Sequence, residues 1–182
     1  MNKSELRKEI RNRKRQFSQA QLGELSLSVI SQLREHPKVK AAHTLLLYYS
    51  LPDEVNTHEW IDELVAQGKQ VILPVVVDNE NMILREYTGR QDLAEGSFHI
   101  QEPIGKPFPR EKYQELEVGI IPGMSFDDKG NRLGRGKGYY DRFLSQVSSI
   151  YKIGVCFGFQ KEQVIPSENT DIRMDEVISS RP

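Results

Sequence analysis

The chain has a single cysteine among its 182 residues, so no disulfide can form within it. Cys156 lies in an apolar stretch, where we expect it to pack in a strand of a protein kept in a reducing compartment. Long apolar runs are lacking as well: none approaches the ~20 residues of a membrane span, and the first residues are too charged for a secretory signal. The sequence therefore predicts a soluble, cytoplasmic protein with no membrane partner.

Three kinds of site have no support in the sequence. The four histidines show no paired metal-binding spacing. Ser125 lacks the Gly-x-Ser-x-Gly elbow of a serine hydrolase. Asp127 and Asn131 resemble the start of a calcium loop, but Lys129 and Arg132 break the EF-hand pattern. We therefore expect neither a histidine metal centre nor a hydrolase triad nor an EF-hand.

Neither sign of charge prevails. The chain has 25 basic and 26 acidic residues and a net charge of −1, which argues against a general polyanion binder, and we expect no nucleic-acid partner. Basic residues gather only in the first fifteen positions, where Lys3 and Arg7 are four apart and share one face of a predicted helix. A basic run of this kind is usually the solvated face of a helix. If the helix packs beside a phosphate site, Lys3 and Arg7 become nucleotide ligands.

The apolar pattern alternates between strands and helices. A run of strand, helix and strand over 44–77 implies a parallel crossover, and ligands of such sheets bind beyond the carboxyl ends of the strands. We expect Asn56 to cap the helix that Gly68 ends, and irregular residues 88–117 to form a substrate wall. Helices are predicted over 2–15, from the capping box 18–21 to His36, and over 139–147, and strands over 44–49, 71–77, 81–87, 118–121, 151–157 and 176–179.

These elements predict an α/β fold: one three-layer, Rossmann-like domain with a mostly parallel central sheet flanked by helices. A chain of 182 residues is long enough for one sizeable core and marginal for two. We therefore expect a single domain over residues 1–182, and a monomer.

Residues 131–141, Asn-Arg-Leu-Gly-Arg-Gly-Lys-Gly-Tyr-Tyr-Asp, are suited to hold phosphate. Their glycines let the backbone approach an anion, and cationic side chains alternate with them. The Walker A pattern does not fit because Gly138 follows Lys137, and the dinucleotide pattern fails because Tyr139 stands where a third glycine is needed. The alternative is a glycine-rich surface turn with solvated charges.

The segment before this loop makes the pattern more specific. Pro-Gly-Met-Ser-Phe-Asp at 122–127, followed by residues 130–141, resembles the signature of the 5-formyltetrahydrofolate cyclo-ligase family. Further segments match in order: the basic pair Lys3 and Arg7, residues 48–55, Phe98, and Pro-Ser-Glu-Asn-Thr-Asp at 166–171, in which Thr170 replaces a common histidine. The resemblance spans nearly the whole chain.

The resemblance implies a ligase that forms a C–N bond. ATP phosphorylates the formyl oxygen of 5-formyltetrahydrofolate, N10 attacks the activated carbon, and 5,10-methenyltetrahydrofolate, ADP and phosphate are released. It also implies Mg²⁺ as cofactor, with ATP and 5-formyltetrahydrofolate as the small-molecule partners. Alternatives are an enzyme of the same fold acting on another acyl or pterin substrate, and a folate- or nucleotide-binding protein without turnover.

The resemblance further assigns residues to roles. Arg135 and Lys137 are the expected catalytic cations, Glu54 the carboxylate that binds the pterin, and Asp141 and Asp171 the Mg²⁺ ligands. Each assignment has a structural alternative. Asp141 could instead stabilise the start of a helix, and Glu54 could cap one. Any aromatic residue could instead pack in the core. The implied ATP-binding residues are Lys3, Arg7, Arg132, Gly134, Arg135, Gly136, Lys137, Gly138, Tyr139 and Tyr140, and the implied substrate-binding residues are Tyr49, Glu54, Phe98, Arg135, Gly136, Lys137, Gly138 and Tyr139.

Overall fold

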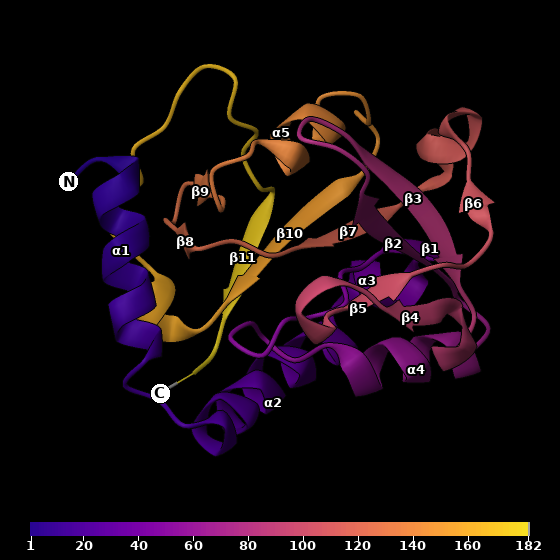
Figure 1. Ribbon diagram of the computed structural model, residues 1–182, viewed down its shortest axis with the longest axis horizontal. Helices are drawn as coiled ribbons and strands as arrows, with labels where there is room; N and C mark the ends of the chain where they lie inside the picture. Colours follow the sequence, from indigo (N-terminus) through magenta and orange to yellow (C-terminus); the bar gives the residue numbers. More distant parts are fainter. Residues whose placement is uncertain (182) are drawn as a thin grey trace.

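Seven strands form one central sheet, most of whose neighbouring strands are parallel (Figure 1). The computed structural model describes residues 1–181. In spatial order the sheet contains β11 (Glu176–Ser179), β10 (Tyr151–Cys156), β7 (Val118–Ile121), β1 (Thr44–Leu46), β2 (Gln70–Val76), β3 (Met82–Tyr87) and β6 (Pro107–Phe108). The first five strands run parallel to one another. Strand β3 is antiparallel to β2, and β6 is antiparallel to β3. The predicted α/β fold class is confirmed.

Helices cover both faces of this sheet. One face carries α2 (Gln19–Glu35), α3 (Pro37–Ala41) and α4 (His58–Ala66), and the other carries α5 (Tyr139–Leu144), while α1 (Lys3–Lys14) stands beside the end of the sheet (Figure 1). Two small hairpins complete the fold: β4 (Leu93–Glu95) with β5 (Gln101–Pro103), and β8 (Ser125–Phe126) with β9 (Arg132–Leu133). Short 3₁₀ helices lie at η1 (Arg90–Asp92), η2 (Ser97–His99), η3 (Arg110–Glu115) and η4 (Gly158–Gln160).

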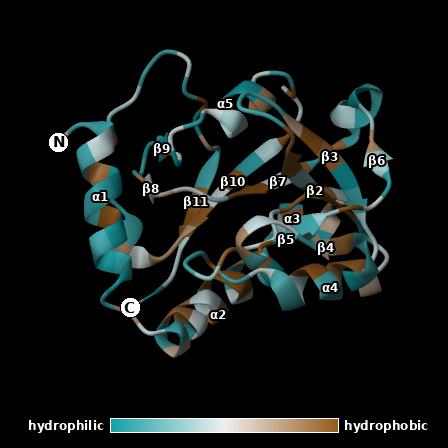
Figure 2. Ribbon diagram, viewed as in Figure 1, coloured by the Kyte–Doolittle hydropathy of each residue, from teal (hydrophilic) through white to brown (hydrophobic). Residues whose placement is uncertain are grey.

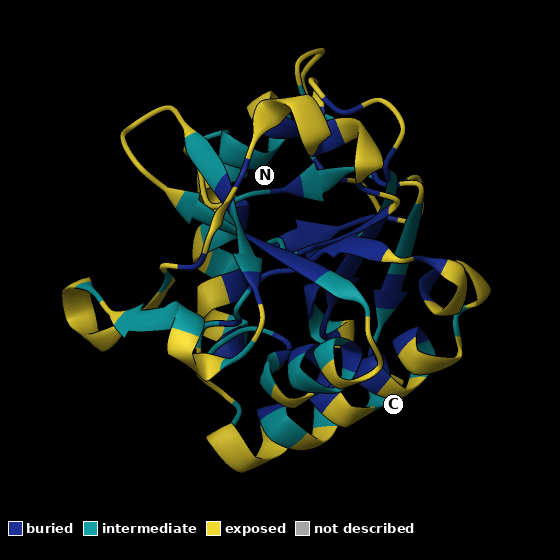
Figure 3. Ribbon diagram, turned by 90° about the vertical axis from the view of Figure 1, so that its right-hand side faces the viewer, coloured by how far each residue is buried: buried dark blue, intermediate teal, exposed yellow. Residues whose placement is uncertain are grey.

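The alternation of side chains along a strand divides the core between the two faces. Leu45 and Leu47 join the apolar cluster under α2 and α4, whereas Leu46 points the other way and packs in the cluster that contains Phe143 of α5. Figure 2 shows the apolar residues concentrated in the strands and on the inner faces of the helices, and Figure 3 shows the same strands buried. Burial on both faces explains why the central strands read as continuous apolar runs.

Helix α1 is fixed by its own small apolar cluster. Leu6 and Ile10 pack against Met124, Leu133 and Ile165, which come from the β8–β9 hairpin and the segment before β11. A capping box closes its start, where Asn2 and Glu5 exchange hydrogen bonds. The charged amino terminus is therefore an ordered helix, as predicted, with one face on the protein.

The segment after β1 differs from the prediction. The strand ends at Leu46 rather than at residue 49, because the side chain of Thr57 donates to the Tyr48 carbonyl at 2.6 Å and draws the chain into a loop. The expected cap at Asn56 was wrong: Thr57 is the residue before α4, and Asn56 accepts only from the His58 amide. Gly68 does end this helix, with φ of 87°.

Three further stretches are more structured or shorter than expected. Residues 88–117 contain β4, β5 and β6. The strand at 118–121 is followed by the β8–β9 hairpin rather than by an open loop. Helix α5 ends at Leu144 instead of residue 147, because its last turn tightens into bonds from Gln146 to Phe143 and from Val147 to Leu144.

The helices formed by residues 1–181 include none that combines the length and the apolarity needed to cross a membrane.

Gly154 offers a test of the packing beneath β10. A Cβ at this position would lie 2.4 Å from a ring carbon of the fully buried Phe126. We expect Gly154→Ala to lower the free energy of unfolding by about 1–3 kcal/mol through overpacking, measured by urea denaturation. Gly23→Ala is the matched control, because that Cβ would meet nothing within 4 Å and alanine favours a helix by up to about 1 kcal/mol. Equal midpoints for wild type and Gly154→Ala would contradict the argument.

Candidate functional site

A large cavity lies where the order of the parallel strands reverses. The chain goes from β1 to β2 on one side and later returns to β7 on the other side of β1. Such a reversal leaves a crevice at the carboxyl ends of the two central strands, where ligands of open α/β sheets bind. Here the crevice is a cavity of about 1090 Å³, lined by segments that follow β1, β2 and β7. A cavity therefore lies at the position predicted for the site.

The cavity brings together nearly all residues that the sequence singled out. Residues far apart in the chain meet here, from Lys3 in α1 to Asp171 before β11. The predicted residues in its lining are Lys3, Arg7, Tyr49, Glu54, Arg132, Gly134, Arg135, Gly136, Lys137, Gly138, Tyr139, Tyr140, Asp141 and Asp171.

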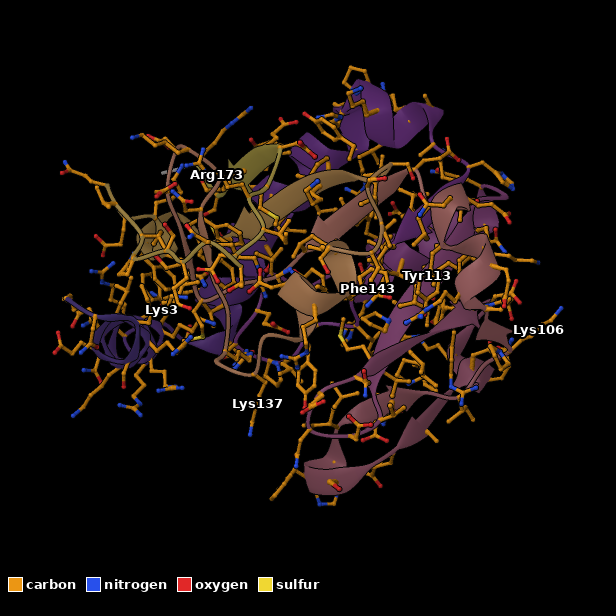
Figure 4. The ribbon with its side chains drawn as sticks, turned by 90° about the horizontal axis from the view of Figure 1, so that it is seen from above. Lys3, Lys106, Tyr113, Lys137, Phe143 and Arg173 are labelled. Atoms are coloured by element: carbon orange, nitrogen blue, oxygen red, sulfur yellow. The ribbon has the colours of Figure 1, made fainter. Side chains whose placement is uncertain are left out.

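The glycine-rich loop forms one side of this cavity. Gly136 and Gly138 have φ of 116° and 71°, a left-handed backbone that glycine adopts without strain. Arg7 Nε donates to the Gly134 carbonyl at 2.8 Å, which ties α1 to the loop. The Lys137 side chain is exposed and extends from the ribbon between α1 and the β4–β5 hairpin (Figure 4).

Arg132 anchors the loop to the sheet. Its Nε donates to the Pro122 carbonyl at 2.7 Å, directly beyond the end of β7. The guanidinium lies over the ring of Tyr140 at 5.0 Å from the centroid. Burial raises the pKa of the Tyr140 hydroxyl, so this ring stays neutral. Arg132 therefore lines the cavity as a fixed cation, held from two sides.

The two candidate metal ligands are both tied to the segment before β11. Asp171 Oδ2 accepts from Lys3 Nζ at 2.8 Å and from the Glu168 amide at 2.9 Å, and Asp141 Oδ1 accepts from the Ile172 amide at 3.0 Å. Although burial alone raises the pKa of Asp171, the hydrogen bond and charge of Lys3 hold it below its usual value. Among residues 1–181, no hydrogen bond engages the second oxygen of either carboxylate.

Within residues 1–181, no three His, Cys, Asp or Glu side chains come together as a metal centre would require. A site made of two carboxylates still suits Mg²⁺, which keeps several waters and takes further oxygens from phosphates.

Glu54 lies on the opposite side of the cavity. Only 13% of its side chain is exposed. Burial raises the pKa of Glu54, although the Leu51 amide, which donates to Oε1 at 2.8 Å, and the Arg135 guanidinium, 3.5 Å from Oε2, oppose the rise. The Tyr49 ring beside it is stacked on His58 with centroids 3.8 Å apart. This end of the cavity pairs a carboxylate with an aromatic wall.

Phe98 is the one predicted site residue outside this cavity. It sits at the turn between β4 and β5 with φ of 56°, and 92% of it is exposed. It lines a smaller cavity of about 420 Å³, which shares Tyr49 and Glu54 with the large one. Phe98 therefore lies with Tyr49 and Glu54 at the smaller cavity, apart from the glycine-rich loop.

Sequence reasoning missed Arg142, which frames the site together with the predicted Tyr139. Tyr139 donates from its hydroxyl to the Asp78 carbonyl, and Arg142 donates from Nε to the Glu80 carbonyl, both at 2.8 Å. Together they hold the turn between β2 and β3 beside α5. The spacing of 139 and 142 on one helix face could have indicated this pair.

Lys14 was missed on the first helix. It is buried and pairs with Asp53 at 3.3 Å. Positions 3, 7 and 14 follow the spacing of one helix face, with Ile10 between them, so the signal was present in the sequence.

Comparison with known proteins gives a single result. The family model described as "5-formyltetrahydrofolate cyclo-ligase family" matches residues 1–180. The 5-formyltetrahydrofolate cyclo-ligase of Escherichia coli is 30% identical over 174 residues, which cover 93% of this chain and 96% of that protein. The mouse protein of the same name is 31% identical over 188 residues, covering 95% and 91%.

A solved structure adds agreement in three dimensions. The NMR structure of Aquifex aeolicus 5,10-methenyltetrahydrofolate synthetase superposes with a TM-score of 0.84 at 35% sequence identity, covering 98% of this chain and 90% of that one. Since the family match, the relatives and the fold agree over almost the entire length, the chain belongs to the 5-formyltetrahydrofolate cyclo-ligase family.

Proposed function

We propose that this protein converts 5-formyltetrahydrofolate to 5,10-methenyltetrahydrofolate with consumption of ATP and release of ADP and phosphate. One observation carries the proposal: a single cavity holds a cationic glycine-rich loop at one side and the buried carboxylate of Glu54 at the other, with Arg135 reaching both. A phosphoryl transfer between two substrates needs both to meet in one place, and this arrangement supplies that place.

The glycine-rich side is the ATP end. Residues 134–138 line the cavity, and Arg132, Arg135 and Lys137 supply cationic side chains to its wall. Cations and oriented amides stabilise the triphosphate and the charge that spreads over the transferred group. Lys3 and Arg7 extend this cationic surface from α1. Tyr139 and Tyr140 close it on the α5 side.

Asp141 and Asp171 are the residues that would hold Mg²⁺ at this end. When bound, the ion neutralises phosphate charge next to the loop. The free oxygen of each carboxylate is available for this, while their other oxygens stay fixed by Ile172 and Lys3.

The Glu54 side is the folate end. An ionised carboxylate accepts two adjacent N–H groups side by side, which matches the amino and ring N–H groups of a pterin. Tyr49, held against His58, offers a flat wall next to it. Phe98 lines the adjoining smaller cavity together with Tyr49 and Glu54, and we propose it as a further substrate contact there.

The reaction requires the protein to align the two substrates and to stabilise charge, and it requires no covalent bond to the protein. Arg135 and Lys137 stabilise the phosphoryl group as it passes to the formyl oxygen. The oxygen then departs with phosphate when N10 attacks the formyl carbon, so a poor leaving group has become a good one. The enclosed part of the cavity excludes water from the activated intermediate.

We further propose that residues 1–182 act as one domain and as a monomer, because one chain supplies every residue of this cavity, from Lys3 to Asp171. A cytoplasmic location fits the lone, buried Cys156. Near-zero net charge fits partners that are small molecules rather than nucleic acids.

The test is an absorbance assay. Purified protein with 5-formyltetrahydrofolate, ATP and Mg²⁺ should develop the band of the conjugated methenyl product, and omission of ATP should abolish it. ATP binding without this band would favour another acyl or pterin substrate. Lack of any multiple turnover of ATP would point to a binding protein.

Lys137→Ala should impair catalysis more than folding, because the residue is exposed on a loop. We expect kcat to fall by roughly 10- to 1000-fold, as for removal of one donor from a developing anion, with an unchanged melting temperature. Lys112→Ala, on the exposed side of η3, is the control and should keep wild-type kcat. An unchanged kcat of Lys137→Ala at saturating ATP would contradict the assigned role.

The buried carboxylate of Glu54 leads us to predict that kcat/KM for the folate depends on pH. Because burial raises its pKa and pterin binding needs the ionised form, kcat/KM for the folate should fall as pH decreases, starting above the ordinary glutamate value of about 4.3. Glu54→Gln should lose this acid limb and lower kcat/KM by about 10- to 100-fold, the loss of one charged hydrogen bond. Glu111→Gln, exposed on η3, should keep the wild-type profile. A wild-type acid limb in Glu54→Gln would refute the assignment.

A further inference from the structure

Four charged side chains form a continuous chain that runs from α1 to Glu54 at the edge of the cavity. Lys14 Nζ lies 3.3 Å from Asp53 Oδ2, Arg135 Nη2 lies 3.2 Å from Asp53 Oδ1, and the same Nη2 lies 3.5 Å from Glu54 Oε2. Three separate parts of the fold contribute: α1, the loop after β1, and the glycine-rich loop. We call this set the ion-pair chain.

Asp53 is the member without an evident task. A carboxylate next to a triphosphate site repels the substrate that the site must attract. Unlike Glu54, it does not line the large cavity. Both of its oxygens are engaged by cations, one from Lys14 and one from Arg135. The position of Asp53 is therefore explained by the two cationic side chains that it holds, and not by a ligand that it binds.

Lys14 makes Asp53 a fixed group. Only 6% of the Lys14 side chain is exposed, and a buried ammonium is costly without an anionic partner. Burial lowers the pKa of Lys14, whereas the charge of Asp53 acts to raise it. Helix α1, which carries Lys14, is itself docked through Leu6 and Ile10. The carboxylate is thus attached to a rigid element.

Arg135 is a mobile group by comparison. It stands between Gly134 and Gly136, and 46% of its side chain is exposed. Among residues 1–181, the polar contacts of its guanidinium are with the carboxylates of Asp53 and Glu54. An exposed arginine on a glycine-rich loop would otherwise sample many rotamers. The contact with Asp53 stabilises the Arg135 rotamer in which the guanidinium points at Glu54.

We propose that Asp53 is a positioning residue that holds the Arg135 guanidinium at the boundary between the glycine-rich loop and Glu54. This is the point at which the phosphoryl group passes from ATP to the folate, so the inference rests on the proposed function. The Asp53 carboxylate weakens ATP binding electrostatically, and its contribution is the orientation of the cation that acts during transfer.

This role predicts a signature that a phosphate ligand would not give. Removal of the Asp53 charge frees a cation for ATP, so ATP should bind at least as tightly as in the wild type. The loss of orientation should lower kcat by about 10- to 100-fold, the usual cost of a misplaced catalytic group. A residue needed only for folding would lower the melting temperature but leave the kcat of the folded protein unchanged.

The experiment compares Asp53→Asn with Asp53→Glu and with the control Asp128→Asn, whose carboxylate pairs with Lys161 away from the cavity. We would measure kcat and both KM values, the dissociation constant of ATP by calorimetry without folate, and the melting temperature. We expect reduced kcat but undiminished ATP affinity for Asp53→Asn, partial recovery of kcat for Asp53→Glu, and wild-type values for Asp128→Asn.

A double-mutant cycle with Arg135→Ala decides whether Asp53 acts through that residue. In the Arg135→Ala background, Asp53→Asn should change kcat by less than twofold. The same fold loss in both backgrounds, or wild-type kcat for Asp53→Asn alone, would overturn the inference while leaving the proposed function intact. A wild-type protein that forms no methenyl product would overturn both.

Discussion

The parallel pairing of β1 with β2 on one side and β7 on the other is the constraint on which the site depends. It brings two chain segments to the same edge of the sheet: the loop that ends in Glu54 and the stretch that leads to the glycine-rich loop. The loop that ends in Glu54 has no regular structure of its own, whereas the stretch after β7 contains the β8–β9 hairpin, and the strand before each segment sets its direction. Because Leu45, Leu46 and Leu47 are fully buried between two helical layers, the register of this strand cannot slip without exposing them.

Helix α1 closes the site from outside the sheet. Its apolar contacts with Met124, Leu133 and Ile165 place a row of cations along the cavity, where Arg7 ties the glycine-rich loop and Lys3 ties the segment around Asp171. The helix thus converts a crevice that every open α/β sheet possesses into a cavity with a cationic wall.

Much of this arrangement could be read from the sequence. The strands at 118–121 and 176–179 were predicted with correct bounds, because buried apolar runs flanked by turn residues give a strong signal. The helix boundary at Asn56 was wrong, because the decisive contact, from Thr57 to the Tyr48 carbonyl, joins residues whose proximity only the fold creates. Although the sequence places Lys14 on the helix face of Lys3 and Arg7, its 3.3 Å contact with Asp53 was missed for the same reason. The exposed position of Phe98 also lay beyond sequence reasoning, since the turn it occupies depends on how β4 pairs with β5.

The contact between Lys3 and Asp171 joins positions 168 residues apart. During synthesis, α1 emerges before the surfaces that it packs on, the β8–β9 hairpin and the stretch around Ile165. The nascent chain must therefore carry this basic helix undocked until those surfaces are made, and the cavity is complete only once Asp171 has left the ribosome. Docking of the amino-terminal helix is thus a late event, which makes an intact carboxyl-terminal segment a condition for any complete site.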